Sequence, residues 1–452
     1  MLPTLVIVGR PNVGKSTLFN RLTRSRSAIV ADTPGVTRDR HYGRGRVGAR
    51  PFLVVDTGGF EPAASAGLPL QMARQTLGAI TEADAVVFLA DGREGLTAQD
   101  AVIAQRLRES GQRIWLVINK AEGLDRSVAA AEFHELGLGA PWPVSAAHGD
   151  GVAALIEDML DAVAGAPEPE PDDAAERGEK RPRIAVVGRP NAGKSTLINT
   201  LLGAERLITS ETAGTTRDSI EVEFDHRGRG YTLVDTAGLR RRARVSDPIE
   251  KFSVIRAMQA IEQANVAILV VDALEGVSDQ DGNIAGYVID AGRATVVAVN
   301  KCDRLSAAER SQLKAQLERR LNYLDFARFQ FISARNGQGL DALMRAVDEA
   351  YRAAFLKMPT PRLTRVVRDA IAAYPPPRKG LNRPKLRYAH QGGNNPPIVV
   401  AHGTGVANLP QSYRRYLEGR VRAVFKLHGT PLRIEYRQGD NPYVHGSGRR
   451  AR

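Results

Sequence analysis

The sequence predicts an α/β protein with two consecutive domains, each built on a mostly parallel sheet with helices on both faces, and a small α+β domain behind them. Three observations support this prediction. A nine-residue segment with two glycines follows a short apolar run at 9–17 and nearly recurs at 188–196. Short apolar runs alternate with helical patterns over 1–164 and again over 183–356, which is typical of parallel sheets. From residue 359 onward, prolines break this alternation.

The two halves are related by an internal repeat. Three pairs of residues from three separate motifs are each 179 positions apart, namely Gly9 and Gly188, Thr37 and Thr216, and Asp56 and Asp235. A spacing held over three motifs indicates duplicated domains. The segment between the halves, 165–182, is rich in Pro, Glu and Asp and lacks apolar periodicity. We expect a solvated linker there; a functional acidic segment is the alternative.

The apolar runs and helical patterns place the elements of each half. The expected first-domain strands are 4–8, 52–56, 85–90, 114–118 and 142–145, with helices at 14–23, 68–80, 98–110 and 151–163. The expected second-domain strands are 183–187, 219–225, 230–235, 266–271, 295–299 and 328–332, and the last helix covers 340–355.

A third domain is expected over 357–445, with a basic tail at 446–452. Its helical stretches are 362–373 and 410–427, and its strand-like runs are 385–390, 397–402 and 431–436. The net charge of the chain is +13, but 361–452 alone contains 18 Lys or Arg and 4 Asp or Glu, a net +14. Such a positive segment on a nearly neutral body is typical of nucleic-acid binding; a solvated surface is the alternative.

Composition indicates a globular chain, since 43% of the residues are hydrophobic and 25% are charged. The single cysteine, Cys302, excludes a disulfide partner within the chain and favours a reducing compartment. Residues 1–5 lead directly into a strand pattern, so we expect no cleaved leader. No apolar run approaches the roughly 20 residues that a membrane-spanning helix needs. We therefore expect a soluble cytoplasmic monomer that does not bind membranes.

The repeated segment matches G-x-x-x-x-G-K-[ST] between a strand and a helix, the context that binds phosphates. Its copies are Gly9, Arg10, Pro11, Asn12, Val13, Gly14, Lys15, Ser16, Thr17 and Gly188, Arg189, Pro190, Asn191, Ala192, Gly193, Lys194, Ser195, Thr196. Backbone N–H groups and the helix N-terminus face a polyphosphate in such loops. We expect Lys15 and Lys194 to contact the β- and γ-phosphates. The hydroxyls of Ser16 and Ser195 are expected to ligate Mg²⁺.

A second motif follows the next apolar strand in each half. It comprises Asp56, Thr57, Gly58 and Gly59 in the first copy and Asp235, Thr236, Ala237 and Gly238 in the second. We expect the aspartate to hold Mg²⁺ through water and a glycine N–H to meet the γ-phosphate. In the loop before this motif, Thr37 and Thr216 are candidates for a switch residue that ligates Mg²⁺ only beside a γ-phosphate. A polar surface loop is the alternative.

A third motif selects the base. It comprises Asn119, Lys120 and Glu122 in the first half and Asn300, Lys301 and Asp303 in the second, each after a buried strand pattern. A carboxylate there accepts two hydrogen bonds from guanine that adenine cannot donate. The runs beginning at Ser145 and Ser333 are expected to support the base with main-chain N–H groups. Glu122 stands where aspartate is usual, so we expect guanine selectivity to survive while first-site affinity is less certain.

These motifs resemble the Der (EngA) family of bacterial GTPases over nearly the whole chain. The resemblance rests on the tandem G domains, on T-x-G-x-T-R-D in both (33–39 and 212–218), and on the run 409–416. It implies a GTP hydrolase that uses GTP/GDP and Mg²⁺ and acts with rRNA in assembly of the large ribosomal subunit. It also implies P-loop GTPase domains and a KH-like third domain, although the GxxG loop that clamps RNA in ordinary KH domains is absent here.

Catalysis is expected to depend on Lys15, Thr37, Lys194 and Thr216, because phosphoryl transfer is mostly positioning and charge stabilisation. Ras-like enzymes orient water with a glutamine after DxxG, but Phe60 and Leu239 stand there, so basal hydrolysis should be slow. Related GTPases with Asn at the position of Asn12 and Asn191 bind K⁺ beside the phosphates. The resemblance therefore implies stimulation by K⁺; an asparagine chosen for its turn conformation is the alternative.

Two further functions remain open. A constitutive rRNA-binding scaffold with structural nucleotide would bind the large subunit equally with a GTP analogue and with GDP. An ATP-driven enzyme is disfavoured by the third motif. The basic run 240–244 is expected either to link the presence of the γ-phosphate to RNA binding or to be a solvated loop. The eight histidines are scattered and show no zinc-binding spacing.

Overall fold

The structure is a computed structural model of the 452-residue chain. It describes residues 2–23, 42–48, 50–57, 76–123, 125, 130–163, 181–203, 207–208, 221–234, 254–378 and 383–438. The chain divides into two compact units, one of residues 1–180 and 245–263 and the other of residues 181–244 and 264–452. The two nucleotide-binding motif sets fall in different units, so each site is built within its own unit.

The described part of the first unit contains a six-stranded sheet of order β2-β3-β1-β4-β5-β6. The strands are β1 (Thr4–Val8), β2 (Tyr42–Gly45), β3 (Phe52–Asp56), β4 (Ala85–Asp91), β5 (Ile114–Asn119) and β6 (Trp142–Pro143). β1 pairs in parallel with β3 and β4, with Val6 opposite Val55 and Val86. Only β2 runs antiparallel, at the edge beside β3. The predicted fold class, a mostly parallel sheet with helices on both faces, is confirmed.

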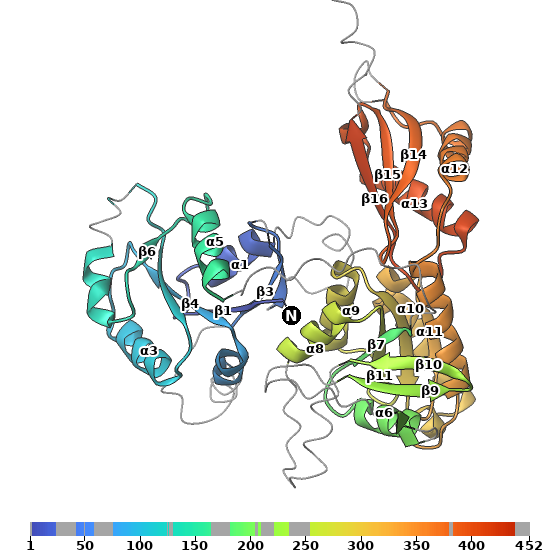
Figure 1. The fold of residues 1–452 in the computed structure, drawn as a ribbon, viewed down its shortest axis with the longest axis horizontal. Helices are drawn as coiled ribbons and strands as arrows, with labels where there is room; N and C mark the ends of the chain where they lie inside the picture. The colour runs from blue at the N-terminus through green and yellow to red at the C-terminus, as the bar shows by residue number, and fades with distance from the viewer. Residues whose placement is uncertain are drawn as a thin grey trace, which may run out of the picture. The chain divides into compact units, whose positions relative to one another are not determined.

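Alternating residues of β1 enter two cores, one on each face of the sheet. Leu5 and Ile7 pack with α1 (Lys15–Thr23) and α5 (Val152–Val163). Val6 and Val8 pack on the other face with α3 (Ala98–Glu109) and the short helix η1 (Glu132–Leu136). Figure 1 shows α5 and α3 on opposite sides of the strands. Burial of both faces explains why these strands are uninterrupted apolar runs.

Helix α8 (Val254–Gln263) belongs to the first unit, although it lies between β10 and β11 in the chain. Ile255 is 3% exposed and is part of the same core as Val6 and Phe88. Arg256 forms an ion pair with Glu82 (3.4 Å). A segment of the second repeat therefore contributes apolar and charged contacts to the first unit.

The described part of the second unit contains a seven-stranded sheet of order β13-β12-β11-β7-β10-β9-β8. Its strands are β7 (Arg183–Val187), β8 (Leu207–Ile208), β9 (Val222–His226), β10 (Arg229–Leu233), β11 (Val266–Asp272), β12 (Ala294–Asn300) and β13 (Arg328–Phe331). Its helices are α6 (Lys194–Gly203), α9 (Asp279–Asp290), α10 (Ala307–Arg320) and α11 (Leu340–Ala354), with short helices η3 (Cys302–Arg304) and η4 (Asn322–Leu324). α6 and α11 bury one face of this sheet.

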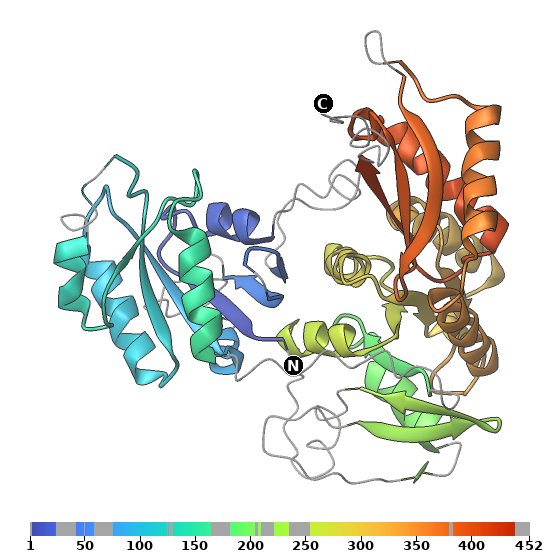
Figure 2. The same ribbon diagram turned by 45° about the horizontal axis from the view of Figure 1, so that its top comes forward.

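The third domain lies in the second unit. Its sheet, of order β14-β15-β16, consists of β14 (Lys385–Gly393), β15 (Ile398–Thr404) and β16 (Arg433–Gln438). β14 is antiparallel and β16 parallel to β15. Helices α12 (Thr360–Ala373) and α13 (Gln411–Phe425) pack on one face, and η5 (Val406–Asn408) precedes α13. Figure 2 shows this sheet with its helices behind it.

Most expected elements that fall on described residues appear within a few residues of their predicted bounds. Most of the expected helix 68–80 and of the expected linker 165–182 lies outside the described residues. Two strands were missed, β2 with the sequence YGRG and the two-residue β8. Glycine and arginine give β2 no apolar alternation, so its pairing at a sheet edge is what makes it a strand. Among the described residues, no helix has both the length and the apolar character that crossing a bilayer requires.

Candidate functional site

The first phosphate-loop segment connects β1 to α1, as its sequence predicts. Gly14 has φ +99°, and a Cβ there would collide with Asn119 Nδ2, so only glycine fits this position. Lys15 begins α1 and is 6% exposed. Its Nζ donates to the carbonyl of Arg10 (2.7 Å), across the loop. Burial lowers the pKa of the Lys15 ammonium, and nearby Asp56 opposes part of that effect.

The second segment has the same geometry between β7 and α6. Lys194 Nζ donates to the carbonyl of Arg189 (2.7 Å). Gly193 has φ +97°, and a Cβ there would collide with Asn300 Nδ2. Both loops therefore present a lysine ammonium and a helix N-terminus to one small space, an arrangement suited to a polyphosphate.

The donor set at the end of β3 fits a magnesium ion. Asp56 is 4% exposed, and its Oδ2 accepts from the Ser16 hydroxyl (2.8 Å). Its other oxygen, Oδ1, is buried and has no hydrogen-bond partner in the described part of the chain. A hydroxyl and a carboxylate with an unpaired oxygen are ligands that Mg²⁺ accepts. The counterpart in the second unit, Asp235, lies outside the described residues.

The asparagine of the third motif ties the nucleotide loops together. Asn119 Nδ2 donates to the carbonyl of Val13 (2.8 Å), and Asn119 Oδ1 accepts from the Ala146 amide (2.9 Å). In the second unit, Asn300 joins Ala192 and Ala334 in the same way, both at 2.9 Å. Each buried asparagine thus fixes the phosphate loop against the loop that begins at Ser145 or Ser333.

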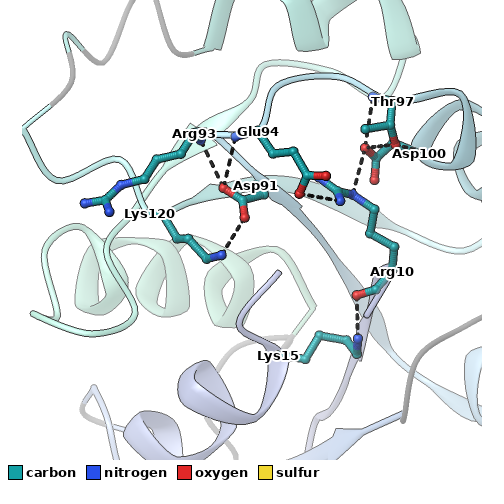
Figure 3. A network of polar contacts seen from close by, with 8 residues as sticks. All are labelled: Arg10, Lys15, Asp91, Arg93, Glu94, Thr97, Asp100 and Lys120. Carbon is teal, nitrogen blue, oxygen red and sulfur yellow. Dashed lines mark hydrogen bonds and ion pairs between the residues drawn. The ribbon is translucent and has the colours of Figure 1, made fainter. Parts of the chain in front are cut away.

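The lysine of the third motif is held by a buried aspartate. Lys120 Nζ contacts Asp91 Oδ2 at 2.5 Å, as Figure 3 shows. In the second unit, Lys301 contacts Asp272 at 2.5 Å. Burial alone would raise the pKa of Asp91, but hydrogen bonds from Lys120 and the Arg93 amide hold that pKa below its usual value. The lysine stems are thereby fixed beside the expected base position.

The two carboxylates that the sequence predicts to select the base differ between the units. Hydrogen bonds from its own backbone amide and from the Ser145 hydroxyl lower the pKa of Glu122. Glu122 Oε1 also accepts from Arg93 (2.8 Å). In the second unit, a hydrogen bond from the Ser333 hydroxyl is the main cause that lowers the pKa of Asp303. Both carboxylates therefore remain ionised at neutral pH, as acceptance of two guanine hydrogen bonds requires.

Arg10 belongs to a buried network that the sequence analysis missed. Its side chain leaves the phosphate loop and contacts Glu94 (2.7 Å) and Asp100 (3.2 Å). Figure 3 shows Asp100 also bonded to Thr97, which caps α3. Arg189 contacts Glu275 and Asp281 in the second unit (2.5 and 3.5 Å). The T-x-x-D and S-x-x-D capping patterns, at 97–100 and 278–281, were the sequence signal available.

The remaining candidate residues are placed as follows. Thr57 donates its hydroxyl to the Ile7 carbonyl (2.7 Å), which holds the start of its motif against β1. Asn12 and Asn191 have φ of 66° and 61°. Eight candidates lie outside the described residues: Thr37, Gly58, Gly59, Thr216, Asp235, Thr236, Ala237 and Gly238. Phe60, Leu239 and the basic run 240–244 also lie outside them.

Comparison with known proteins gives matches over both repeats and the third domain. The family model described as "50S ribosome-binding GTPase" matches 4–120 and 183–301. The model described as "KH-domain-like of EngA bacterial GTPase enzymes, C-terminal" matches 357–437. A solved structure of Era with MgGDPNP and 16S ribosomal RNA nucleotides has 22% identity, covers 60% of this chain and 97% of its own, and has a TM-score of 0.31.

Full-length relatives give the same assignment. GTPase Der of Chromobacterium violaceum is 57% identical over 443 residues, which are 98% of this chain and 93% of that protein. GTPase Der of Nitrosospira multiformis is 58% identical over 445 residues, 98% of this chain and 94% of that protein. With more than half of the residues identical over almost the whole length, the chain belongs to the Der (EngA) family of GTPases.

Proposed function

We propose that this GTPase acts in assembly of the large ribosomal subunit, with its nucleotide state setting its affinity for that subunit and its precursors. The match of both nucleotide-binding halves to the model described as 50S ribosome-binding GTPase carries the proposal. The net charge of +14 over 361–452 supports rRNA as the contact, because phosphates attract clustered Lys and Arg. We infer a monomer that works in the cytoplasm.

Contacts within the second unit couple the third domain to the second nucleotide site. The amide of Thr295, on the strand that ends at Asn300, donates to the Gly429 carbonyl (2.6 Å). The Gly429 amide donates to the Phe326 carbonyl (2.7 Å), and the Arg422 guanidinium lies over the Phe326 ring (4.9 Å). A nucleotide-dependent movement of the second GTPase domain would therefore carry the RNA-binding domain with it.

We assign the site roles as the sequence analysis expects them. Lys15 and Lys194 contact phosphate, and Ser16, Asp56 and Thr37, with Ser195, Asp235 and Thr216 in the second site, hold Mg²⁺. The bound ion would neutralise charge that develops on the γ-phosphate oxygens. The Asn119 and Asn300 bridges position the loops. Glu122 and Asp303 accept hydrogen bonds from guanine, and the amides that follow Ser145 and Ser333 support the base.

We further propose that K⁺ stimulates GTP hydrolysis through Asn12 and Asn191. Asn12 and Asn191 both have positive φ, a conformation that asparagine tolerates better than most residues. An asparagine chosen for this conformation is therefore the alternative to a K⁺ ligand. Hydrolysis in KCl and in NaCl at matched ionic strength tests whether the side chains also bind the ion. We expect faster turnover in KCl, and Asn12→Gly with Asn191→Gly should keep the loop conformation but lose the difference. Equal turnover of the unchanged protein in both salts would refute the K⁺ site.

Binding to purified large subunits tests the main proposal. The affinity should differ between a non-hydrolysable GTP analogue and GDP, and it should fall steeply as salt rises, because phosphate contacts release counterions. Equal affinity in the two nucleotide states would instead favour a constitutive rRNA-binding scaffold. Absence of binding at low salt in either state would exclude both.

A further inference from the structure

The sheet of the third domain has two chemically different faces. Leu386, Ala389, Val399 and Ala401 point to the core with α12 and α13. The β14–β15 register shifts between Leu386 and Tyr388, so Tyr388 and His390, which flank Ala389, lie on the opposite face. There they meet the ring of His402 from β15. We call these three side chains the ring platform. Tyr388 is 46% exposed, so this face carries a large aromatic ring that the domain core does not use.

The three rings are nearly parallel. Tyr388 lies opposite His402 in the β14–β15 register, with ring centroids 4.4 Å apart and an interplanar angle of 7°. His390 and His402 are separated by 5.2 Å at 23°. Tyr388 and His390 are 6.3 Å apart at 21°. This separation is much shorter than the other two added together, so the three rings do not form one column with His402 in the middle. Tyr388 and His390 therefore lie side by side and both stack against His402.

The His402 ring is uncharged at neutral pH. Burial, and then the neighbouring His390 and Arg437, lower the pKa of His402. The buried Nε2 of His402 has no hydrogen-bond partner in the described part of the chain. A neutral imidazole held between strands presents a flat π-surface, and aromatic and histidine rings of this kind stack on unpaired bases.

Cations lie on the strands next to the ring platform. Arg437 on β16 lies opposite His402, with 62% of its side chain exposed. Lys385 and Arg387, on the strand that carries Tyr388, are exposed. Glu435, also on β16, pairs with Arg437 through its carboxylate at 3.1 Å. Within a segment of net charge +14, this face combines stacking surface with attraction for phosphate.

We propose that the ring platform stacks unpaired bases of single-stranded RNA on the sheet face opposite α12 and α13. This inference rests on the proposed function only in taking RNA as the partner. Base stacking on rings is tolerant of sequence, because every base has a π-face, while neighbouring cations follow the backbone. Bases within a duplex already stack on one another, so the site selects an unpaired segment.

The test uses the full chain and two single-stranded oligonucleotides of about eight nucleotides, within the usual site size. One is an oligouridylate, and the other has the same phosphates but abasic sugars. We expect the unchanged protein to bind the oligouridylate at least about fivefold more tightly, because one stacked base is worth about five- to 150-fold in affinity. Tyr388→Ala should abolish this preference, whereas Tyr388→Phe should retain it.

Matched controls separate stacking from charge and from folding. Tyr374→Ala removes a 68% exposed tyrosine elsewhere in the same domain and should leave the preference intact. Arg437→Gln should weaken binding to both oligonucleotides alike and reduce the salt slope by about 0.7. Unchanged hydrogen exchange of the β14 and β15 amides would show that the third domain of each variant is folded, whereas GTP binding reports only on the GTPase domains.

Two results would overturn the ring platform. The first is equal binding of both oligonucleotides by the unchanged protein, including no binding to either. The second is an unchanged preference in Tyr388→Ala, even if large-subunit binding were lost, since a ribosomal protein would then be the partner of this face. In either case the nucleotide-dependent binding of the unchanged protein to large subunits would still test the proposed function by itself.

Discussion

In the first GTPase domain, Arg93 donates to Glu122 at 2.8 Å, whereas in the second domain Leu274 and Asp303 stand at the same two positions. Both pairs keep the offset of 181 that relates Asp91 to Asp272. Leu274 is 45% exposed and can make no such bond. The asparagine bridges, by contrast, are matched within 0.1 Å between the domains.

The difference shows which parts of the duplicated site can vary. The Asn119 bridge joins the phosphate-loop segment to the loop that begins at Ser145, so a change there would displace the predicted phosphate-binding backbone. The base-selecting carboxylate is a terminal side-chain group, and its length can change if something orients it. Glutamate has one more rotatable bond than aspartate, and holding such a side chain costs conformational entropy. Arg93 restricts that freedom in the one domain that carries the longer acid.

The largest expected effect concerns stoichiometry. The unchanged protein should bind two equivalents of labelled GTP in magnesium buffer, whereas Lys15→Ala and Lys194→Ala should each bind one. Each change removes contacts to two phosphates, and charge-assisted hydrogen bonds contribute about 1.5–3 kcal/mol apiece, so affinity at that site should fall by about 10²–10⁴-fold. If either variant still bound two equivalents of GTP at low micromolar protein, the substituted lysine would not be needed to hold nucleotide at its site.

The second prediction concerns the buried arginines. Arg10→Ala leaves Asp100, which is 0% exposed, without its guanidinium and should destabilise the first domain by about 3–5 kcal/mol. Denaturant-dependent hydrogen exchange of the β1 amides measures the stability of the first domain. Exchange of the β7 amides measures the stability of the second domain. Arg106→Ala, which breaks an exposed pair with Glu109, is the control and should change stability by less than about 0.5 kcal/mol.

In the second domain, Arg189→Ala removes the corresponding arginine, and the stability that it costs should depend on pH. Burial raises the pKa of Asp281, although Ser278 and Arg189 oppose it. A carboxyl whose pKa is raised in the folded state binds its proton more readily there, so folded protein gains relative stability as pH falls through that pKa. The cost of Arg189→Ala should therefore shrink as pH falls from 7 towards 5. A cost that grows with acid would contradict this account of Asp281.

Most of the fold could be predicted because buried parallel strands leave uninterrupted apolar runs, such as Ala85–Asp91 and Val266–Asp272. β2 could not be predicted, since YGRG becomes a strand only by pairing with β3. The assignment of α8 to the first unit also escaped prediction, because its apolar pattern shows that one face is buried but not against which sheet.

The candidate site could be predicted where its residues are close in sequence. Lys15 and Ser16 follow directly from the phosphate-loop motif, and Asn119 from its own. The Arg10–Asp100 pair joins residues 90 positions apart, and nothing in either local pattern indicates that the arginine turns away from the phosphates. The Arg93–Glu122 bond is similar, because a motif shows the unusual glutamate but not the partner that orients it.

The third prediction tests base selection at one site at a time. In a Lys194→Ala background, Glu122→Ala should weaken GDP binding at the first site, and in a Lys15→Ala background Asp303→Ala should do so at the second. The exposed loop lets water replace part of what is lost, so we expect about 10- to 100-fold, near the 1.5–3 kcal/mol of one charge-assisted bond. The affinity for ADP should not change, so the ratio of GDP affinity to ADP affinity should fall. Glu109→Ala, an exposed acid elsewhere, is the control.

The smallest effect concerns Arg93 itself. Its side chain is 58% exposed, so its bond to Glu122 should be worth about 0.2–1 kcal/mol, and Arg93→Leu should weaken GDP binding at the first site by at most about fivefold. The effect should shrink as salt rises, because screening weakens exposed ion pairs. Leu274→Arg should leave the second site unchanged, since the shorter Asp303 is oriented without a partner at that position. A gain at the second site from Leu274→Arg would mean that the arginine acts on the nucleotide directly rather than through the length of the acid.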